Sequence, residues 1–241
     1  NTIDIAAAQA RGIPVCNAAG YGTEAVAQHV FALLLAMTNR VETHARHVAG
    51  GGWAEAPDWT YRLSPLVQLT GRTLGIVGLG RIGQAVARLG QAFGMTVLGH
   101  SRSARAVPGV RMVDRDTLFA DSDVISLHCP LTAGNAGFVD EALLRRMKPD
   151  AYLINTARGP LIDEGALLRV LQSGQLAGVA LDVLSEEPPP PDHPLFGAPR
   201  CLITPHIAWG TQAARARLIE MAAENLAAFQ QGHPQSNVWA S

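Results

Sequence analysis

An arginine and a histidine in the second half of the chain could act together on a small carboxylic acid with a neighbouring carbonyl group. Arg158 lies in the segment N-T-A-R-G, and its planar guanidinium could bind carboxylate and carbonyl oxygens through two bonds, which a lysine could not do. His206 lies in the segment T-P-H-I-A-W and could give a proton to the developing alkoxide. The competing interpretations are a surface salt bridge for Arg158 and a structural role for His206.

Two neighbouring glutamates could serve as the carboxylate partner of His206. Glu186 and Glu187 lie in S-E-E-P, directly before the proline-rich segment 188–191. That segment cannot form a helix or an interior strand, so we predict a stiff loop that brings a carboxylate to the imidazole. A docking motif for an SH3-type domain is the weaker alternative. The carboxylate would favour the protonated ring, but spacing alone does not choose between the two glutamates.

A glycine-rich turn predicts a site for a dinucleotide. The sequence G-L-G-R-I-G at 78–83 follows an apolar run. In this pattern Gly78 permits a tight turn, Gly80 lets the backbone approach a pyrophosphate, and Gly83 lets the next helix pack closely on the strand. A helix that begins near Arg81 would direct its free N–H groups at the phosphates. A chance glycine-rich turn is the alternative.

The place where an acidic residue commonly contacts the adenosine ribose is taken by Ser101. An aspartate there would repel a 2′-phosphate, whereas Ser101 could donate a hydrogen bond to one and Arg102 or Arg105 could pair with it. The sequence therefore predicts that NADP(H) is preferred over NAD(H). The alternative is that both arginines are solvated loop charges.

Asp182 ends another apolar run, 178–183. Its carboxylate could accept a hydrogen bond from the amide of a nicotinamide and so orient the ring. It could equally cap a turn, and the sequence alone leaves both roles open.

These candidates follow short β-prone runs that alternate with helical patterns. The predicted strands cover residues 13–17, 73–77, 95–98, 123–127, 151–155, 178–183 and 201–204. The predicted helices cover residues 23–48, 81–93, 140–146, 163–173 and 211–231. This alternation predicts an α/β fold of the Rossmann type, a doubly wound parallel sheet with helices on both faces. Ligands bind outside the carboxyl ends of such strands, where Arg158, Asp182 and His206 lie.

The composition restricts the class of protein. The chain has 241 residues, of which 48% are hydrophobic and 16% charged, so it can bury a large core. The formal net charge of −1 argues against nucleic acid or an anionic membrane as the main partner. The three cysteines lie far apart without a C-x-x-C pair or a Cys/His cluster, which indicates reduced thiols in the cytoplasm and no metal site. The longest apolar stretch, 31–37, is too short to span a bilayer.

Several motifs together resemble those of the D-2-isomer-specific 2-hydroxyacid dehydrogenase family. They occur in the same order as in the family, and they extend over nearly the whole chain. They are G-L-G-R-I-G at 78–83, L-H-C-P-L-T at 127–132, M-K-P at 147–149, N-T-A-R-G at 155–159, L-D-V-x-x-x-E-P at 181–188 and T-P-H-I-A at 204–208. The segments L-S-x-E-P-P-P and P-H-I-A-W are similar to those of glycerate dehydrogenases, also called hydroxypyruvate and glyoxylate reductases. The resemblance implies hydride transfer between NAD(P)H and a small 2-oxo or D-2-hydroxy acid.

The resemblance also implies roles for individual residues. Arg158, Glu187 and His206 would be the catalytic trio, with His206 as the proton donor and Glu187 chosen over Glu186. Arg81 and Ile82 would lie at the pyrophosphate. The remaining cofactor contacts would be Cys129, Pro130, Thr156, Ala157, Asp182, His206, Ala208 and Trp209.

The resemblance predicts two domains. Residues 23–211 would form the NAD(P)-binding domain, and the helix at 23–48 would build a homodimer, although a core helix of its own subunit is the alternative. Residues 1–22 and 212–241 would be the remnant of a flavodoxin-like substrate domain, and we expect that the N-terminal part of that domain is missing from this sequence.

Two other functions compete with the enzyme. A corepressor branch of the same family senses nicotinamide cofactors with the same fold and trio, but this chain shows no partner-binding tail. A methyltransferase with a Rossmann fold would leave the placement of the arginine, glutamate and histidine unexplained.

Overall fold

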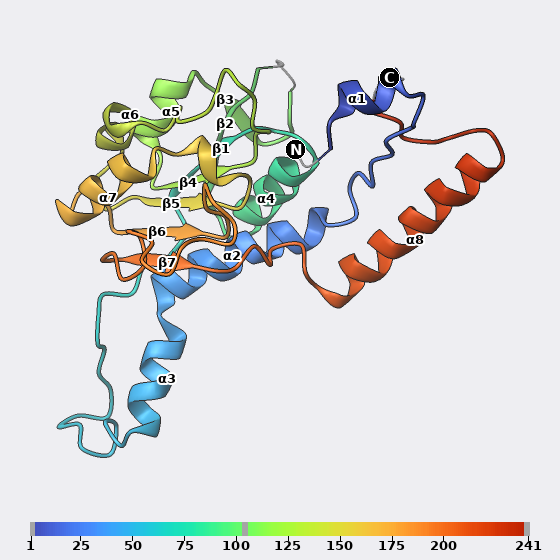
Figure 1. The fold of residues 1–241 in the computed structure, drawn as a ribbon. Coiled ribbons are helices and arrows are strands. Elements are labelled where there is room, and N and C mark those ends of the chain that lie inside the picture. Colours follow the sequence, from blue (N-terminus) through green and yellow to red (C-terminus); the bar gives the residue numbers. More distant parts are fainter. Residues whose placement is uncertain (1–2, 103–105, 239–241) are drawn as a thin grey trace. The chain divides into compact units, whose positions relative to one another are not determined.

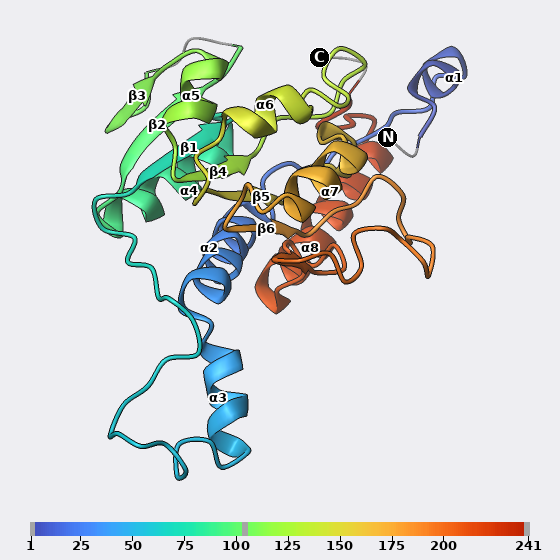
Figure 2. The same ribbon diagram turned by 90° about the vertical axis from the view of Figure 1, so that its left-hand side faces the viewer.

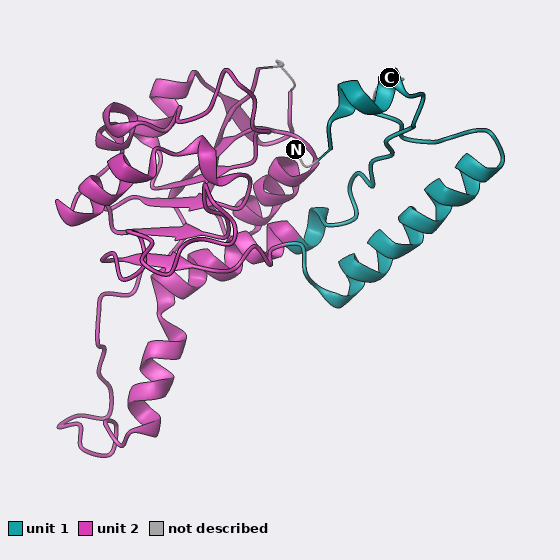
Figure 3. Ribbon diagram, in the orientation of Figure 1, with its two compact units in different colours: residues 1–25, 209–241 teal, residues 26–208 magenta. Residues whose placement is uncertain are grey.

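The computed structural model describes residues 3–102 and 106–238. The chain divides into two compact units, of which one comprises residues 26–208 and the other residues 1–25 and 209–241 (Figure 3). The predicted remnant of a substrate domain, 1–22 with 212–241, falls in the second unit, and its assignment to such a domain stays a prediction.

The larger unit is built on a parallel sheet. Within the described residues it has seven strands in the order β3-β2-β1-β4-β5-β6-β7. Their bounds are β1 (Thr73–Val77), β2 (Thr96–His100), β3 (Val110–Met112), β4 (Val124–Leu127), β5 (Tyr152–Asn155), β6 (Gly178–Leu181) and β7 (Cys201–Ile203). Every neighbouring pair is parallel. The order runs outward from β1 in both directions, which confirms the predicted doubly wound Rossmann topology.

Helices cover both faces of this sheet (Figures 1 and 2). One face carries α5 (Arg115–Asp121), α6 (Glu141–Arg146) and α7 (Glu164–Gln172), and the other carries α2 (Thr23–Asn39) and α4 (Arg81–Ala92). Successive strand residues enter opposite cores, since Ile125 packs with the first set and Val124 with the second. The central strands are therefore buried on both faces, which explains their continuous apolar sequences.

The predicted helix at 23–48 is interrupted, so the prediction of one helix was wrong. Arg40 has a left-handed backbone (φ 49°), which ends α2 because an α-helix cannot continue through that conformation. A separate helix, α3 (Val41–Ala49), follows. With the loop 50–70 it forms an arm that extends away from the sheet (Figures 1 and 2).

The predicted strand at 13–17 was also wrong. In the smaller unit Cys16 makes only an isolated antiparallel bridge with Asn237, so this extended segment lacks a neighbouring strand to pair along its length. Of the described helices, α1 (Ile5–Ala10) and α8 (Gln212–Gln230) lie wholly in this unit.

Among the described helices, none has the length and hydropathy that a membrane span requires. Cys16, Cys129 and Cys201 are all free thiols. The cytoplasmic location that the sequence suggested stays a prediction.

Candidate active site

The glycine-rich turn joins β1 to α4 in a conformation that depends on two of its glycines. Gly78 has a φ of 97°, and a Cβ there would lie 2.6 Å from the amide nitrogen of Cys129. A Cβ on Gly83 would collide with the carbonyl oxygen of Gly78. Gly80, by contrast, has open space around its Cβ position and directly precedes the first residue of α4, Arg81. The turn thus leaves room for a ligand at the N-terminus of a helix, where phosphates bind.

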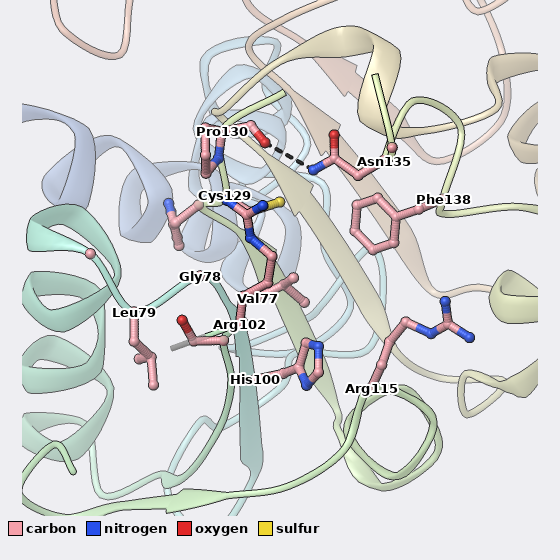
Figure 4. A pocket seen from close by; sticks show the side chains of 14 residues that line it. Val77, Gly78, Leu79, His100, Arg102, Arg115, Cys129, Pro130, Asn135 and Phe138 are labelled. Carbon is pink, nitrogen blue, oxygen red and sulfur yellow. Dashed lines mark hydrogen bonds between the residues drawn. The ribbon is translucent and has the colours of Figure 1, made fainter. Parts of the chain in front are cut away.

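A cavity of about 770 Å³ opens beside this turn, at the carboxyl ends of β1, β2 and β4 (Figure 4). The strand order reverses at this point, where open α/β sheets bind their ligands. Six of the predicted cofactor residues line it, namely Gly78, Gly80, Ser101, Arg102, Cys129 and Pro130. Arg102 extends toward Cys129, whereas Arg115 lies on the opposite side of His100 from Arg102 (Figure 4). Burial raises the pKa of the Cys129 thiol, and the nearby Arg102 partly offsets this.

The cavity has lining residues that the sequence did not single out. His100, Arg115, His128, Asn135 and Phe138 contribute to it. Asn135 is held in place because its side-chain nitrogen donates to the carbonyl of Pro130 at 2.9 Å. His128 lies in the L-H-C-P-L-T motif, which was a signal for its position, but Arg115 comes from the start of α5 and carries no motif of its own.

Two buried polar atoms next to the strand ends are without partners among the described residues. They are Nδ1 of His128 and Oγ1 of Thr156. The other ring nitrogen of His128 lies 2.8 Å from Oγ of Ser126, and burial lowers the pKa of His128 to about 3. Buried polar atoms normally have a hydrogen-bond partner. Of these two residues His128 lines the cavity, and together with the open space at Gly80 it makes the cavity fit a polar ligand such as a dinucleotide.

Asp182 organises the turn that follows β7. Its carboxylate accepts hydrogen bonds from the amides of Ile207 at 2.9 Å and Ala208 at 2.8 Å, and from Oγ1 of Thr204 at 2.6 Å. Its carbonyl accepts from the amide of His206 at 2.8 Å. Burial opposes ionisation, but the nearby His29 and the hydrogen bonds from Thr204 and the two amides lower the pKa of Asp182 below its ordinary value. The turn-capping role is therefore realised, and contact with a nicotinamide stays a prediction.

His206 and Glu187 are in direct contact. Nδ1 of His206 lies 2.7 Å from Oε2 of Glu187, and Oε1 of Glu187 accepts from the amide of Leu184 at 3.0 Å. His206 has a left-handed backbone (φ 54°), which costs about 1–3 kcal/mol for a residue with a side chain and is held by the hydrogen bonds to Asp182. Both side chains remain partly exposed, at 40% for His206 and 36% for Glu187. Of the two candidate glutamates, it is therefore Glu187 that meets the histidine.

Arg158 follows β5, the strand next to β6. Its backbone is fixed because the side chain of Asn155 donates to the carbonyl of Arg158 at 2.8 Å. The next residue, Gly159, opens a short 3₁₀ helix (Gly159–Leu161), and a Cβ on it would collide with the backbone of Leu184. Arg158 is thus adjacent in sequence to a segment that packs against the Glu187 loop. Its exposed guanidinium donates to the carbonyl of Ala157 at 2.6 Å, and no described contact joins it to Glu187 or His206.

The remaining predicted residues have varied positions. Arg81 and Ile82 begin α4, Thr156 and Ala157 follow β5, and Ala208 is buried with its amide on Asp182. Trp209 belongs to the smaller unit, where its ring packs edge-on against Tyr21 with centroids 6.2 Å apart. Arg105 lies outside the described residues. Within the described ranges, no group of three or more His, Cys, Asp or Glu side chains could hold a metal ion.

Comparisons with known proteins indicate the family to which the chain belongs. A family model, the NAD-binding domain of D-isomer specific 2-hydroxyacid dehydrogenases, matches residues 31–208. The chain is 43% identical to a hydroxypyruvate reductase from Blautia hydrogenotrophica over 237 residues, which make up 97% of this chain and 74% of that protein.

Two solved structures are similar along almost the whole chain. A protein from Thermus thermophilus has a TM-score of 0.90 and 43% identity, and the match covers 98% of this chain and 75% of the other. An NADPH-dependent glyoxylate/hydroxypyruvate reductase from Sinorhizobium meliloti, solved with NADP and malonate, has a TM-score of 0.89 and 34% identity, with 99% and 74% covered.

The chain belongs to the D-isomer specific 2-hydroxyacid dehydrogenase family. It is an oxidoreductase that transfers a hydride between a nicotinamide cofactor and a small 2-oxo or D-2-hydroxy acid, which confirms the function predicted from the motifs. The relatives are named as enzymes, and this does not favour the corepressor alternative.

Proposed function

We propose that this enzyme reduces hydroxypyruvate and glyoxylate to D-glycerate and glycolate, with His206 as the proton donor. The names of its relatives, which include a hydroxypyruvate reductase, glyoxylate reductases and a glycerate dehydrogenase, support this substrate class. The observation that carries the proposal is the 2.7 Å contact between His206 and Glu187 at the carboxyl edge of the sheet.

The side chains divide the work between them. Bound NADPH would supply the hydride that reduces the carbonyl carbon. Glu187 holds Nδ1 of His206 and stabilises the imidazolium, so Nε2 is the ring atom left to give its proton to the carbonyl oxygen as it becomes an alkoxide. Arg158 binds the substrate carboxylate through its planar fork. His206 then regains its proton from solvent, to which its ring is partly exposed.

We further propose that NADP(H) is the preferred cofactor. Ser101 and Arg102 line the cavity directly after β2, where the adenosine ribose would lie, and neither repels a 2′-phosphate. Arg115 lines the same cavity and adds a second positive charge, although it also pairs with Asp116 at 3.1 Å. The NADP bound to the Sinorhizobium meliloti relative is consistent with this preference.

We propose that the arm of α3 and the loop 50–70 builds a homodimer. It presents apolar side chains that are unusually exposed, with Trp59 at 81%, Val41 at 68% and Trp53 at 55%. Exposed apolar groups gathered within one segment of the chain favour a protein–protein contact. Sedimentation of the unaltered protein and of a Trp59→Glu variant tests this: the variant should shift toward the monomer, and a monomeric unaltered protein would contradict the proposal.

The substrate proposal is tested with a panel of 2-oxo acids assayed with both NADPH and NADH. We expect kcat/KM to be highest for hydroxypyruvate or glyoxylate with NADPH. Pyruvate or a bulkier 2-oxo acid as the best substrate would contradict the substrate class, and a preference for NADH would contradict the cofactor assignment alone.

A further inference from the structure

A second histidine approaches the turn that carries His206, from a helix on one face of the sheet. His29 lies in α2, and its Nε2 is 3.2 Å from Oγ1 of Thr204 and 3.5 Å from Oδ1 of Asp182. Its side chain is 19% exposed, whereas that of Asp182 is fully buried. None of the motifs that indicate the site includes His29.

The hydrogen bonds around Thr204 determine which atom of this group donates. Oγ1 of Thr204 has a single hydrogen, and it is directed at Oδ1 of Asp182 at 2.6 Å. Toward His29 the hydroxyl can therefore only accept, so Nε2 of His29 must carry a hydrogen. His29 donates to Thr204, and Thr204 donates to Asp182. Each bond in such a chain polarises and strengthens the next.

Asp182 in turn accepts hydrogen bonds from the backbone amides of three consecutive residues. Its carbonyl holds the amide of His206, and its carboxylate holds the amides of Ile207 and Ala208. These bonds keep His206 in its left-handed backbone conformation. A shift of the Asp182 carboxylate would therefore move the imidazole with respect to Glu187.

We propose that His29 is a positioning residue for the reaction: through Thr204 and Asp182 it fixes the backbone from which His206 delivers its proton. The inference rests on the proposed function, because it assumes that His206 is the acid. His29 itself does not exchange a proton with the substrate. What it contributes is a donor hydrogen at Nε2, so a neutral donor of similar reach should replace it.

The test compares three substitutions at position 29 in the full chain. His29→Leu keeps the volume but removes the donor, and we expect kcat to fall by about 10- to 100-fold because misplaced catalytic groups cost rates of this order. The KM for the 2-oxo acid should stay within about threefold, since the lost interaction matters in the transition state. His29→Gln, whose amide can donate to Thr204, should restore most of kcat. His29→Asn is polar but too short to reach Thr204, so it should behave like His29→Leu and replaces it where that variant does not fold.

Substitutions of Thr204 test the same chain of hydrogen bonds. Thr204→Ser keeps the hydroxyl and should retain kcat, whereas Thr204→Val should lower it as His29→Leu does. Because both act through one chain of hydrogen bonds, the double variant His29→Leu/Thr204→Val should be little worse than the worse single variant. His233→Leu, an exposed histidine after α8, is the matched control and should leave kcat unchanged.

The outcomes separate this inference from the proposed function. Full kcat in folded His29→Leu and His29→Asn, together with a large loss in His206→Ala, would overturn the role of His29 alone. Full kcat in His206→Ala would overturn the proposed function instead. Equal losses for His29→Gln, His29→Asn and His29→Leu, or additive losses in the double variant, would indicate a packing role for His29 and would also overturn the inference.

Discussion

Nδ1 of His206 lies 2.7 Å from Oε2 of Glu187, a residue that is separated from it by 19 positions in the chain. The contact joins the loop after β6 to the turn after β7, which are neighbouring strands. Since one ring nitrogen is occupied by a carboxylate, the other is the one that can face a substrate. This pairing of an imidazole with a carboxylate is the arrangement that orients the ring of a general acid.

Glu187→Gln should lower kcat for reduction by about 10- to 100-fold. The neutral amide replaces a charge-assisted hydrogen bond to Nδ1 of His206 with a weaker one, so the ring is held less firmly in the position from which it delivers its proton. Steady-state measurements of kcat for the variant and the unaltered enzyme test this. Glu186→Gln removes an adjacent, exposed carboxylate and should leave kcat unchanged. An unchanged kcat for Glu187→Gln would remove Glu187 from the mechanism.

Arg158→Lys should lower kcat/KM for the 2-oxo acid by about 100-fold or more, because an ammonium group cannot form two parallel bonds to the substrate. Steady-state kinetics with varied 2-oxo acid would show the loss as a higher KM together with a lower kcat. Arg169→Lys, on α7 and paired with Glu141 at 2.8 Å, is the matched control and should behave like the unaltered enzyme. Normal kinetics for Arg158→Lys would refute a role for the guanidinium fork.

Arg102→Ala should lower kcat/KM for NADPH by about 10- to 100-fold, the range expected for a charged hydrogen bond, and should change the value for NADH little. Ser101→Asp should act in the same direction by repelling the 2′-phosphate. Arg111→Ala removes an exposed charge of the same sign from β3 and controls for the net charge. Equal losses with both cofactors in Arg102→Ala would contradict a role in discriminating between them.

His128 should make the protein less stable as the pH falls below neutrality. Burial lowers the pKa of His128 from 6.5 to about 3 in the folded protein, so between these values the unfolded chain binds a proton that the folded protein does not. The free energy of unfolding should therefore drop by about 2 kcal/mol between about pH 7 and about pH 5. Urea unfolding at several pH values measures this dependence. His128→Gln should flatten it, and an unchanged slope in that variant would assign the effect to other groups.

The positions of the candidate residues followed from the sequence, because a side chain directly after an apolar parallel strand lies at the ligand-binding edge. This rule placed Arg158, Asp182 and His206 correctly after β5, β6 and β7. It could not choose Glu187 over Glu186, since both lie in one loop and only the resemblance to the family indicated which of them meets the histidine.

Features without a local signature escaped prediction. Arg40 ends α2 in a left-handed conformation. Glycine or asparagine usually occupies such a position, and either residue would have indicated the helix end in the sequence. The strand β3 has only three residues, of which two are exposed, so it lacks an apolar run. His29 and Arg115 reach their sites from helices far away in sequence, and their roles depend on tertiary contacts that periodicity does not reveal.

The most direct test of the central claim is the turnover of His206→Ala on hydroxypyruvate, measured beside the binding of NADPH to the same variant. Loss of the general acid predicts a kcat lower by about 10²- to 10⁴-fold, while NADPH still binds because the glycine turn and its cavity are untouched. A kcat equal to that of the unaltered enzyme would contradict the account.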